Sequence, residues 1–189
     1  MNAIHDELMK FSKDILEFHI PRWEELPDIE LYMDQVITFI ENNISIFSVS
    51  TNEKIITPSM INNYVKLNLI PKPIKKKYNK THLAYLIAIS ILKHVFTIQE
   101  VRDGILFQAR INGERGAYNL FCEEQELAIK YLVNQINVES ESPITNISMN
   151  SENLVIKMST LAFATKIIAE KTIELQKDFM DKEKTINSI

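Results

Sequence analysis

Apolar residues recur at helical spacing near the N-terminus of the chain. The first of them, at intervals of four, three, four and three residues, are Ile4, Leu8, Phe11, Ile15 and Phe18. These intervals place the five side chains on one face, because an α-helix turns once every 3.6 residues or so, about one hundred degrees per residue. The segment is therefore predicted to be an amphipathic helix whose apolar face needs a partner surface.

Prolines and polar residues divide the next part of the chain. Pro21 and Pro27 interrupt any helix there, and Trp23 between them is expected to anchor the linker on an apolar surface. Apolar spacing then predicts a second helix over about residues 33–42. The Ser- and Asn-rich stretch 43–56 is expected to be irregular.

A short third helix is predicted over residues 57–67. Thr57 can cap its first turn, and Pro58 fits the first helical position, where a missing N–H costs nothing. Asn68 is expected to end the helix because asparagine tolerates the left-handed conformation. The proline- and lysine-rich residues 71–78 are then predicted to be extended or hairpin-like.

The fourth helix is expected to form the buried centre of the molecule. It follows Asn79, a helix-capping residue type, and residues 83–92 are almost wholly apolar. Thr97 and Glu100 have the spacing of a capping box, which predicts a fifth helix running toward residue 110. The fifth helix is expected to end at the glycine-containing residues 112–116.

Two more helices are predicted in the C-terminal part, over about residues 119–137 and 151–181. An acidic, serine-rich loop, residues 138–150, separates them. The last helix is long for a globular protein. Its apolar seam weakens near Thr165 and Thr172, which argues against a regular coiled coil.

Composition supports a helical, intracellular protein. The chain has only three glycines in 189 residues, fewer than hairpins and bulges normally need, so the predicted fold class is all-α. The only cysteine, Cys122, cannot form an internal disulfide, and the acidic residues after it are expected to raise its pKa. A signal-peptide pattern and a bilayer-length apolar run are missing from the sequence, which predicts a cytoplasmic protein without a membrane segment.

Charge is distributed unevenly along the chain. The net charge is −4, yet residues 54–99 contain eight lysines and no Asp or Glu. The remaining residues carry 13 basic and 25 acidic side chains. A basic island in an acidic chain is typical of contact with nucleic acid.

The third helix and the lysine-rich segment carry the candidate chemistry. Ser59, Asn62 and Lys66 share one helix face, whereas Ile61, Tyr64 and Val65 can face the core. Ammonium groups neutralise DNA phosphates, and Asn or Ser can hydrogen-bond base edges in the major groove. The candidate DNA-binding residues are Ser59, Asn62, Asn63, Lys66, Lys72, Lys75, Lys76, Lys77, Tyr78 and Lys80.

Simpler interpretations of these residues stay open. The lysines can form a solvated loop, the asparagines can be ordinary surface residues, and Tyr64 and Tyr78 can be residues at the edge of the core. A metal site or cofactor is not expected, because the four histidines lack ligand spacing. Nucleotide-binding and hydrolase motifs are missing as well, so an enzyme is not predicted.

The run from Met60 to Ile105 resembles the second half of the winged helix-turn-helix of mercury-resistance-regulator (MerR-type) transcription factors. In that family a recognition helix ends in a tyrosine-containing turn, a proline and a tyrosine bound the wing, and a leucine-rich helix follows. The corresponding places are taken here by Tyr64, Lys66, Leu69, Pro71, Tyr78, Leu83, Leu86, Ile89, Phe96, Thr97 and Val101. Asn62 stands where the family has an arginine, and Lys77 with Tyr78 replaces a Tyr-Arg pair.

The chain as a whole is more closely similar to a bacterial family, domain-of-unknown-function family 1836. This resemblance implies a MerR-like DNA-binding fold with N- and C-terminal helical extensions. We expect an N-terminal helix and linker over residues 1–30, the winged helix-turn-helix over 31–112, and a C-terminal region for dimerisation or an effector over 113–189.

The resemblance also leads to a functional expectation. The protein is expected to be a non-enzymatic transcriptional regulator that binds double-stranded DNA, as a homodimer, through recognition helix 57–67 and wing 71–80. The alternative is a helical protein-interaction module on the same scaffold that does not bind DNA. A small-molecule effector is left open.

Overall fold

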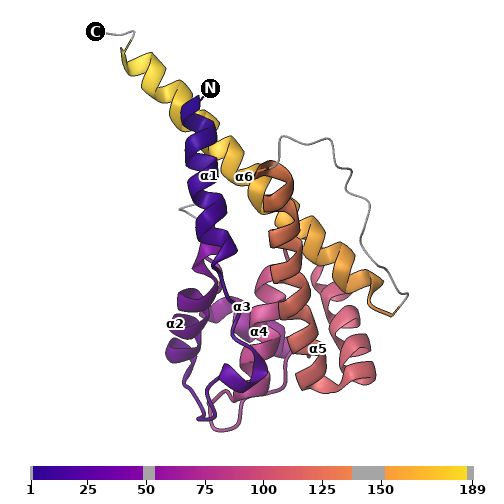
Figure 1. The fold of residues 1–189 in the computed structure, drawn as a ribbon. Coiled ribbons are helices and arrows are strands. Elements are labelled where there is room, and N and C mark those ends of the chain that lie inside the picture. The colour runs from indigo at the N-terminus through magenta and orange to yellow at the C-terminus, as the bar shows by residue number, and fades with distance from the viewer. Residues whose placement is uncertain (1, 49–53, 138–151, 187–189) are drawn as a thin grey trace.

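The computed structural model describes residues 2–48, 54–137 and 152–186, and within them the chain is α-helical (Figure 1). The described residues form no strand and only two isolated antiparallel bridges, Leu31 with Tyr78 and Ile74 with Lys77. The predicted all-α class is confirmed. The elements in chain order are α1 (Asn2–Leu16), η1 (Trp23–Glu25), α2 (Met33–Ile44), η2 (Ser45–Phe47), α3 (Pro58–Lys66), α4 (Lys80–Leu92), α5 (Ile98–Asn137) and α6 (Leu154–Ile186).

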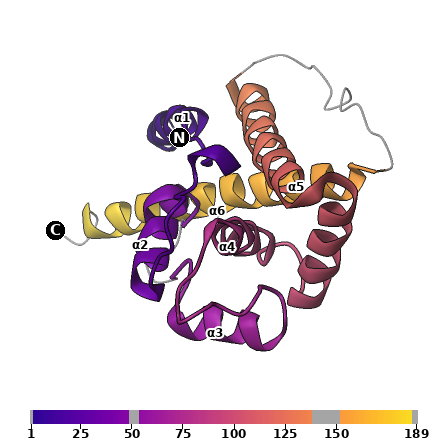
Figure 2. The ribbon, with the colours of Figure 1, turned by 90° about the horizontal axis from the view of Figure 1, so that it is seen from below.

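Helix α4 is the central element, as predicted. All of its residues from 82 to 91 are buried except Tyr85. A helix that is apolar on every side is stable only when other elements surround it. Helices α2, α5 and α6 pack on α4, and α4 lies between α3 and α6 (Figure 2).

Polar caps begin these helices where the sequence predicts them. Thr57 Oγ1 accepts a hydrogen bond from the Met60 amide at 3.2 Å, and Asn79 Oδ1 accepts one from the His82 amide at 3.3 Å. The Thr97 amide donates to Glu100 Oε2 at 2.8 Å, and the Glu100 amide donates back to Thr97 Oγ1 at 3.3 Å. Such bonds satisfy amide groups that a helix leaves without an internal acceptor.

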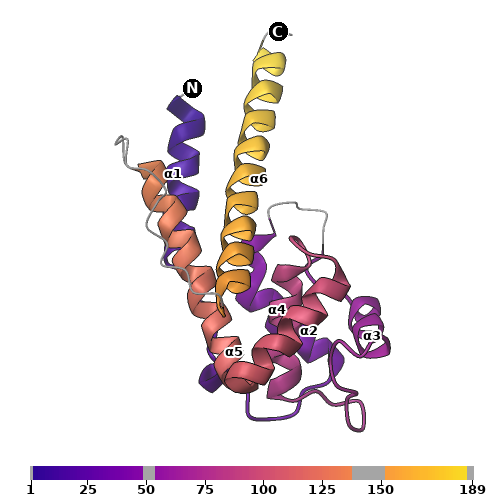
Figure 3. The same ribbon diagram turned by 90° about the vertical axis from the view of Figure 1, so that its right-hand side faces the viewer.

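Helix α5 consists of two helical halves that meet at a sharp bend. Gly113 has φ 68° and ψ 164°, a conformation outside the helical region that is accessible almost only to glycine. The two halves diverge from this point (Figures 1 and 3). The helix end predicted over residues 112–116 is therefore a bend at a single residue. The next helical half begins directly after it rather than near residue 119.

Helices α1 and α6 pack against α5 and against each other. The N-terminal end of α1 and the C-terminal end of α6 lie at the same end of the molecule (Figure 3). The Lys171 ammonium lies 5.8 Å from the centre of the Phe11 ring, which places α6 over the predicted apolar face of α1. Part of the predicted apolar seam of α6 is used within the chain, because Leu161 and Ile168 pack against the core beside the buried Phe163 and Ile167.

The linker between α1 and α2 is held on the second half of α5. The Arg22 guanidinium donates to both carboxylate oxygens of Glu126, at 2.8 and 2.7 Å, and the Tyr118 hydroxyl donates to the Pro21 carbonyl at 2.8 Å. The Trp23 ring meets the Tyr118 ring edge to face at 6.5 Å. Trp23 is thus an anchor, as predicted, and the Arg22–Glu126 pair is a second anchor that the sequence pattern did not indicate.

Two predicted loops fall wholly or partly outside the described residues. The loop over residues 138–150 lies outside them, as do residues 49–53 of the stretch predicted to be irregular. The described part of that stretch contains η2, whose Phe47 is buried. Among the described helices, none combines the length and the apolar content that crossing a bilayer requires.

Candidate nucleic-acid interface

Helix α3 has one buried and one exposed face. Ile61 and Tyr64 belong to the hydrophobic core, and burial raises the pKa of the Tyr64 hydroxyl. The polar residues expected to contact DNA are all exposed: Ser59, Asn62, Asn63 and Lys66. The predicted division of this helix is therefore confirmed.

The end of α3 directs the following residues back toward the core. Asn68 adopts φ 53°, the left-handed conformation predicted for it. The Leu69 amide donates to the Tyr64 carbonyl at 2.9 Å, and the Asn68 amide donates to the Val65 carbonyl at 3.1 Å. This pair of bonds defines a Schellman motif, and it is followed by the buried residues Leu69 and Ile70.

The lysine-rich segment makes a tight two-residue turn. Ile74 and Lys77 form an antiparallel bridge, and the two residues between them, Lys75 and Lys76, have φ of 51° and 63°. Positive φ at both central residues is the mark of a type I′ turn. The segment is hairpin-like, as predicted, and its loop has only the two central residues of the turn.

Tyr78 is a core residue rather than part of this surface. Its side chain is almost fully enclosed, with 2% of the residue exposed, and its ring packs edge to face on His82 at 5.4 Å. Its backbone exchanges two hydrogen bonds of 2.8 Å with Leu31. Burial raises the pKa of the Tyr78 hydroxyl. The prediction that Tyr78 contacts DNA is therefore wrong, because DNA cannot reach a side chain that belongs to the core.

Two of the candidate lysines face carboxylates from the α1–α2 linker. Lys80 Nζ lies 2.5 Å from Asp28 Oδ1, and Lys77 Nζ lies 3.9 Å from Glu30 Oε2. Lys77 also lies 5.7 Å from the centre of the Tyr32 ring. The linker thus compensates part of the positive charge, and no pattern in the sequence indicates that residues 28–30 lie beside these lysines.

The remaining lysines have no carboxylate partner in the described part of the chain. They are Lys66, Lys72, Lys75 and Lys76, and all four are exposed. The segments that carry them lie on the side of α4 that faces away from α6 (Figures 2 and 3). We refer to these lysines together with Ser59, Asn62 and Asn63 as the α3–lysine surface.

Exposed apolar side chains occur on the segments that border this surface, and the sequence prediction did not include them. Ile29 is 70% exposed, Ile74 is 69% exposed, and Tyr32 is 53% exposed. They lie in the linker and at the lysine turn. In the sequence these three residues differ from the core residues only in that they fit no helical apolar pattern. That difference does not distinguish a binding residue from an ordinary loop residue.

Metal-ligating side chains are not grouped, and the cysteine is enclosed, in the part of the chain that the structure describes. Over residues 2–48, 54–137 and 152–186, no three His, Cys, Asp or Glu side chains are grouped to hold a metal ion. Cys122 is fully buried, and burial raises the pKa of its thiol to about 12. The acidic residues beside it in sequence are therefore not the main cause of its raised pKa. What the α3–lysine surface can do chemically is bind an anion.

Fold and surface together define an all-α protein that presents a short polar helix beside a lysine-bearing turn. The chain belongs to the DUF1836 family, a domain of unknown function, whose sequence model matches residues 21–121. This range includes the linker carboxylates, α3, the lysine turn, α4 and the bend in α5. No curated protein and no solved structure matches the chain.

Proposed function

We propose that this protein is a transcriptional regulator of the cytoplasm that binds double-stranded DNA through the α3–lysine surface. In this proposal the fold is a MerR-like winged helix-turn-helix with helical extensions. Helix α3 enters the major groove, and residues 71–80 act as the wing that contacts flanking phosphates.

The observation that carries the proposal is the group of lysines without carboxylate partners. Lys66, Lys72, Lys75 and Lys76 are exposed, and within the described residues none of them pairs with an acid. Each phosphate that an ammonium group neutralises releases condensed counterions, and this release is the main sequence-independent source of affinity for DNA. Ser59, Asn62 and Asn63 supply the hydrogen-bonding groups that could reach base edges.

A homodimer is part of the proposal. About four phosphate contacts per protomer support only weak binding at physiological salt. Proteins with a helix-turn-helix usually overcome this limit by pairing on two half-sites that are one helical turn of DNA apart. A monomer bound to one half-site would discriminate poorly between DNA sequences.

The test is a salt titration of binding to fluorescently labelled, fragmented genomic DNA, starting at low ionic strength. The informative variant is Lys75→Asn with Lys76→Asn, because asparagine keeps the positive φ of the turn while both charges are removed. The slope of log affinity against log salt should become shallower by about 1.8, with affinity about ten-fold lower at low salt.

The matched control is Lys10→Gln with Lys13→Gln. It also removes two exposed charges, but from α1. DNA binding by this control should follow that of the wild type. Equal losses in the two double variants would contradict the proposal, as would unchanged binding by the turn variant.

A second candidate function, a helical protein-interaction module, is favoured by one observation. Ile29, Ile74 and Tyr32 expose large apolar areas beside a positive surface that Asp28 and Glu30 partly compensate. Apolar and aromatic residues inside a polar rim are typical of protein contacts. A wild-type protein that shows no salt-dependent binding of any duplex would favour this candidate over DNA binding.

A further inference from the structure

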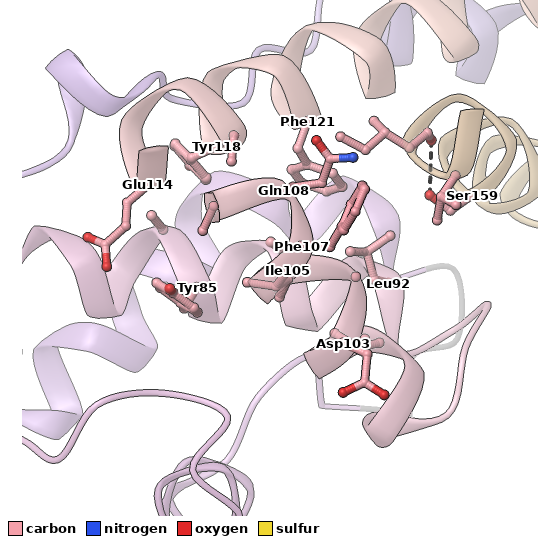
Figure 4. A pocket seen from close by; sticks show the side chains of 18 of the residues that line it. Tyr85, Leu92, Asp103, Ile105, Phe107, Gln108, Glu114, Tyr118, Phe121 and Ser159 are labelled. Carbon is pink, nitrogen blue, oxygen red and sulfur yellow. Dashed lines mark hydrogen bonds between the residues drawn. The ribbon is translucent and has the colours of Figure 1, made fainter. Parts of the chain in front are cut away.

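A cavity of about 540 Å³ lies among α4, both halves of α5 and the beginning of α6 (Figure 4). It exists because small residues stand where the packed helices would need large ones. Those that line it are Ala84, Ala88, Gly104, Ala109 and Ala117. A space of this size, which opens at the surface of the molecule, is larger than the water-sized voids that packed helices enclose.

The walls of the cavity are apolar and partly aromatic. Tyr85, Tyr118 and Phe121 contribute rings, and Ile105 contributes an aliphatic side chain. The cavity is also open to solvent, because Phe107 and Val155 line it while remaining 55% and 54% exposed. A volume in the range of about 300–1,000 Å³ with such walls is typical of sites for small organic ligands.

Carboxylates are the charged groups at this cavity. The lining residues include Glu100, Asp103 and Glu114 but no Lys, Arg or His. Glu114 and Asp103 lie at opposite ends of the space, with Tyr85 and Ile105 between them (Figure 4).

The carboxylates at the cavity are satisfied by neutral groups rather than by cations. Glu114 accepts a hydrogen bond from the Thr81 hydroxyl at 3.1 Å. Asp103 accepts one from the Gln99 side-chain amide at 3.0 Å, and Glu100 caps its own helix. Within the described residues no ammonium or guanidinium group pairs with these three exposed carboxylates, so the lining of the cavity has a net negative charge, which favours a cation.

We propose that this cavity binds a small amphipathic molecule with an aromatic or branched apolar body and one positive charge. The apolar body occupies the space between α4 and α5, and the positive charge lies toward Glu114 or Asp103. This proposal rests on the cavity and its charges, and it does not require that the protein bind DNA.

The first experiment uses N-phenyl-1-naphthylamine, a neutral dye whose fluorescence rises in an apolar site. Its fluorescence should rise saturably with wild-type protein. Two competitors with the same naphthalene body then test the charge: 1-naphthylmethylammonium should displace the dye at about ten-fold lower concentration than 1-naphthylacetate. With the variant Asp103→Asn plus Glu114→Gln, the two competitors should displace the dye at nearly the same concentration.

The second experiment fills the cavity from its own wall. A Cβ at Gly104 would meet no atom within 4 Å, so Gly104→Leu extends into open space, whereas Gly104→Ala is a matched control that leaves most of the volume. The Leu variant should weaken dye binding by about ten-fold or more, and the Ala variant should stay within about three-fold of the wild type. Ala109→Leu provides a second filling variant, and thermal unfolding shows that each variant is folded.

Several outcomes would overturn the proposal. These are a wild-type protein without saturable dye binding, full binding by both folded Leu variants, or displacement by the acetate at the same concentration as by the ammonium compound. A second copy of the chain is the competing occupant. If Phe107→Asp converts a dimer into monomers and only the monomers bind the dye, the cavity face is a subunit interface instead.

Discussion

Two glycines of α5 show how the local backbone decides the effect of one substitution. Gly113 has a positive φ and forms the bend, whereas Gly104 lies within the regular part of the first half. Neither position is crowded, because a Cβ would meet no atom within 4 Å at either of them. The difference between them is therefore conformational rather than steric.

We predict opposite changes in the free energy of unfolding for these two positions. Gly113→Ala should lower it by about 1–3 kcal/mol, since the Gly113 conformation is strained for any residue with a Cβ. Gly104→Ala should raise it by about 0.4–1 kcal/mol, because alanine loses less backbone entropy in a helix. Urea unfolding monitored by far-UV circular dichroism measures both. Changes of the same sign would contradict the backbone assignment at the bend.

The α1–α2 linker is an element without regular structure that is held by specific polar contacts. Glu126 on α5 receives hydrogen bonds from the Arg22 guanidinium and from the Ile20 amide. The Glu126 side chain is only 11% exposed. Burial acts to raise the pKa of Glu126, but the bonds from Arg22 and Ile20 outweigh it and lower the pKa. The pair therefore favours the folded state only while Glu126 is ionised.

This linkage gives the stability a definite dependence on pH. Because the folded pKa of Glu126 lies below its ordinary value of 4.5, the stabilisation is complete above that value and is lost as the pH falls through the folded pKa. At pH 7 Glu126→Gln should lower the free energy of unfolding by about 1.5–3 kcal/mol. The difference from the wild type should shrink in acid, as urea unfolding between pH 7 and pH 3 would show.

Glu123→Gln is the matched control for this element, since Glu123 lies on the same helix and is exposed. It should change the free energy of unfolding by less than about 0.5 kcal/mol at every pH. A constant difference between Glu126→Gln and the wild type across the pH range would show that the pair is not coupled to protonation.

A hydrophobic core extends across the described parts of the chain, from α1 to α6. Buried residues from Ile15 to Ile167 form a single hydrophobic cluster. Aromatic contacts connect its distant parts: the Phe47 ring lies 4.6 Å from Phe18 and 5.2 Å from Phe163. Phe163 therefore joins α6, which lies beyond the family match, to residues within it.

Phe163 should accordingly be one of the most sensitive positions in the molecule. Phe163→Ala leaves a cavity in the core and should lower the free energy of unfolding by about 3–5 kcal/mol. Met180→Ala, also on α6 but half exposed, should change it by less than about 0.5 kcal/mol. The fluorescence of Trp23, the single tryptophan, and circular dichroism should report the same transition. Separate transitions would show that α6 unfolds independently.

Local features of this protein could be predicted from residues that are close in the chain. The helices begin and end near Thr57, Asn68, Asn79 and Thr97 because caps and left-handed turns involve neighbours within about four residues. The burial of α4 follows from its nearly unbroken apolar run, and the division of α3 into two faces follows from helical periodicity; both patterns are local. These features include the polar half of the α3–lysine surface.

Other features depend on residues far apart in the chain, and periodicity carries no information about them. The pairing of Lys80 with Asp28 and the burial of Tyr78 against Leu31 require the linker to lie along the lysine turn. The cavity is lined by small residues of α4 and of both halves of α5, which are brought together only when α5 bends at Gly113 and packs on α4. These features are decided by the tertiary structure, because the burial and the charge pairing of a side chain depend on which distant segments pack around it.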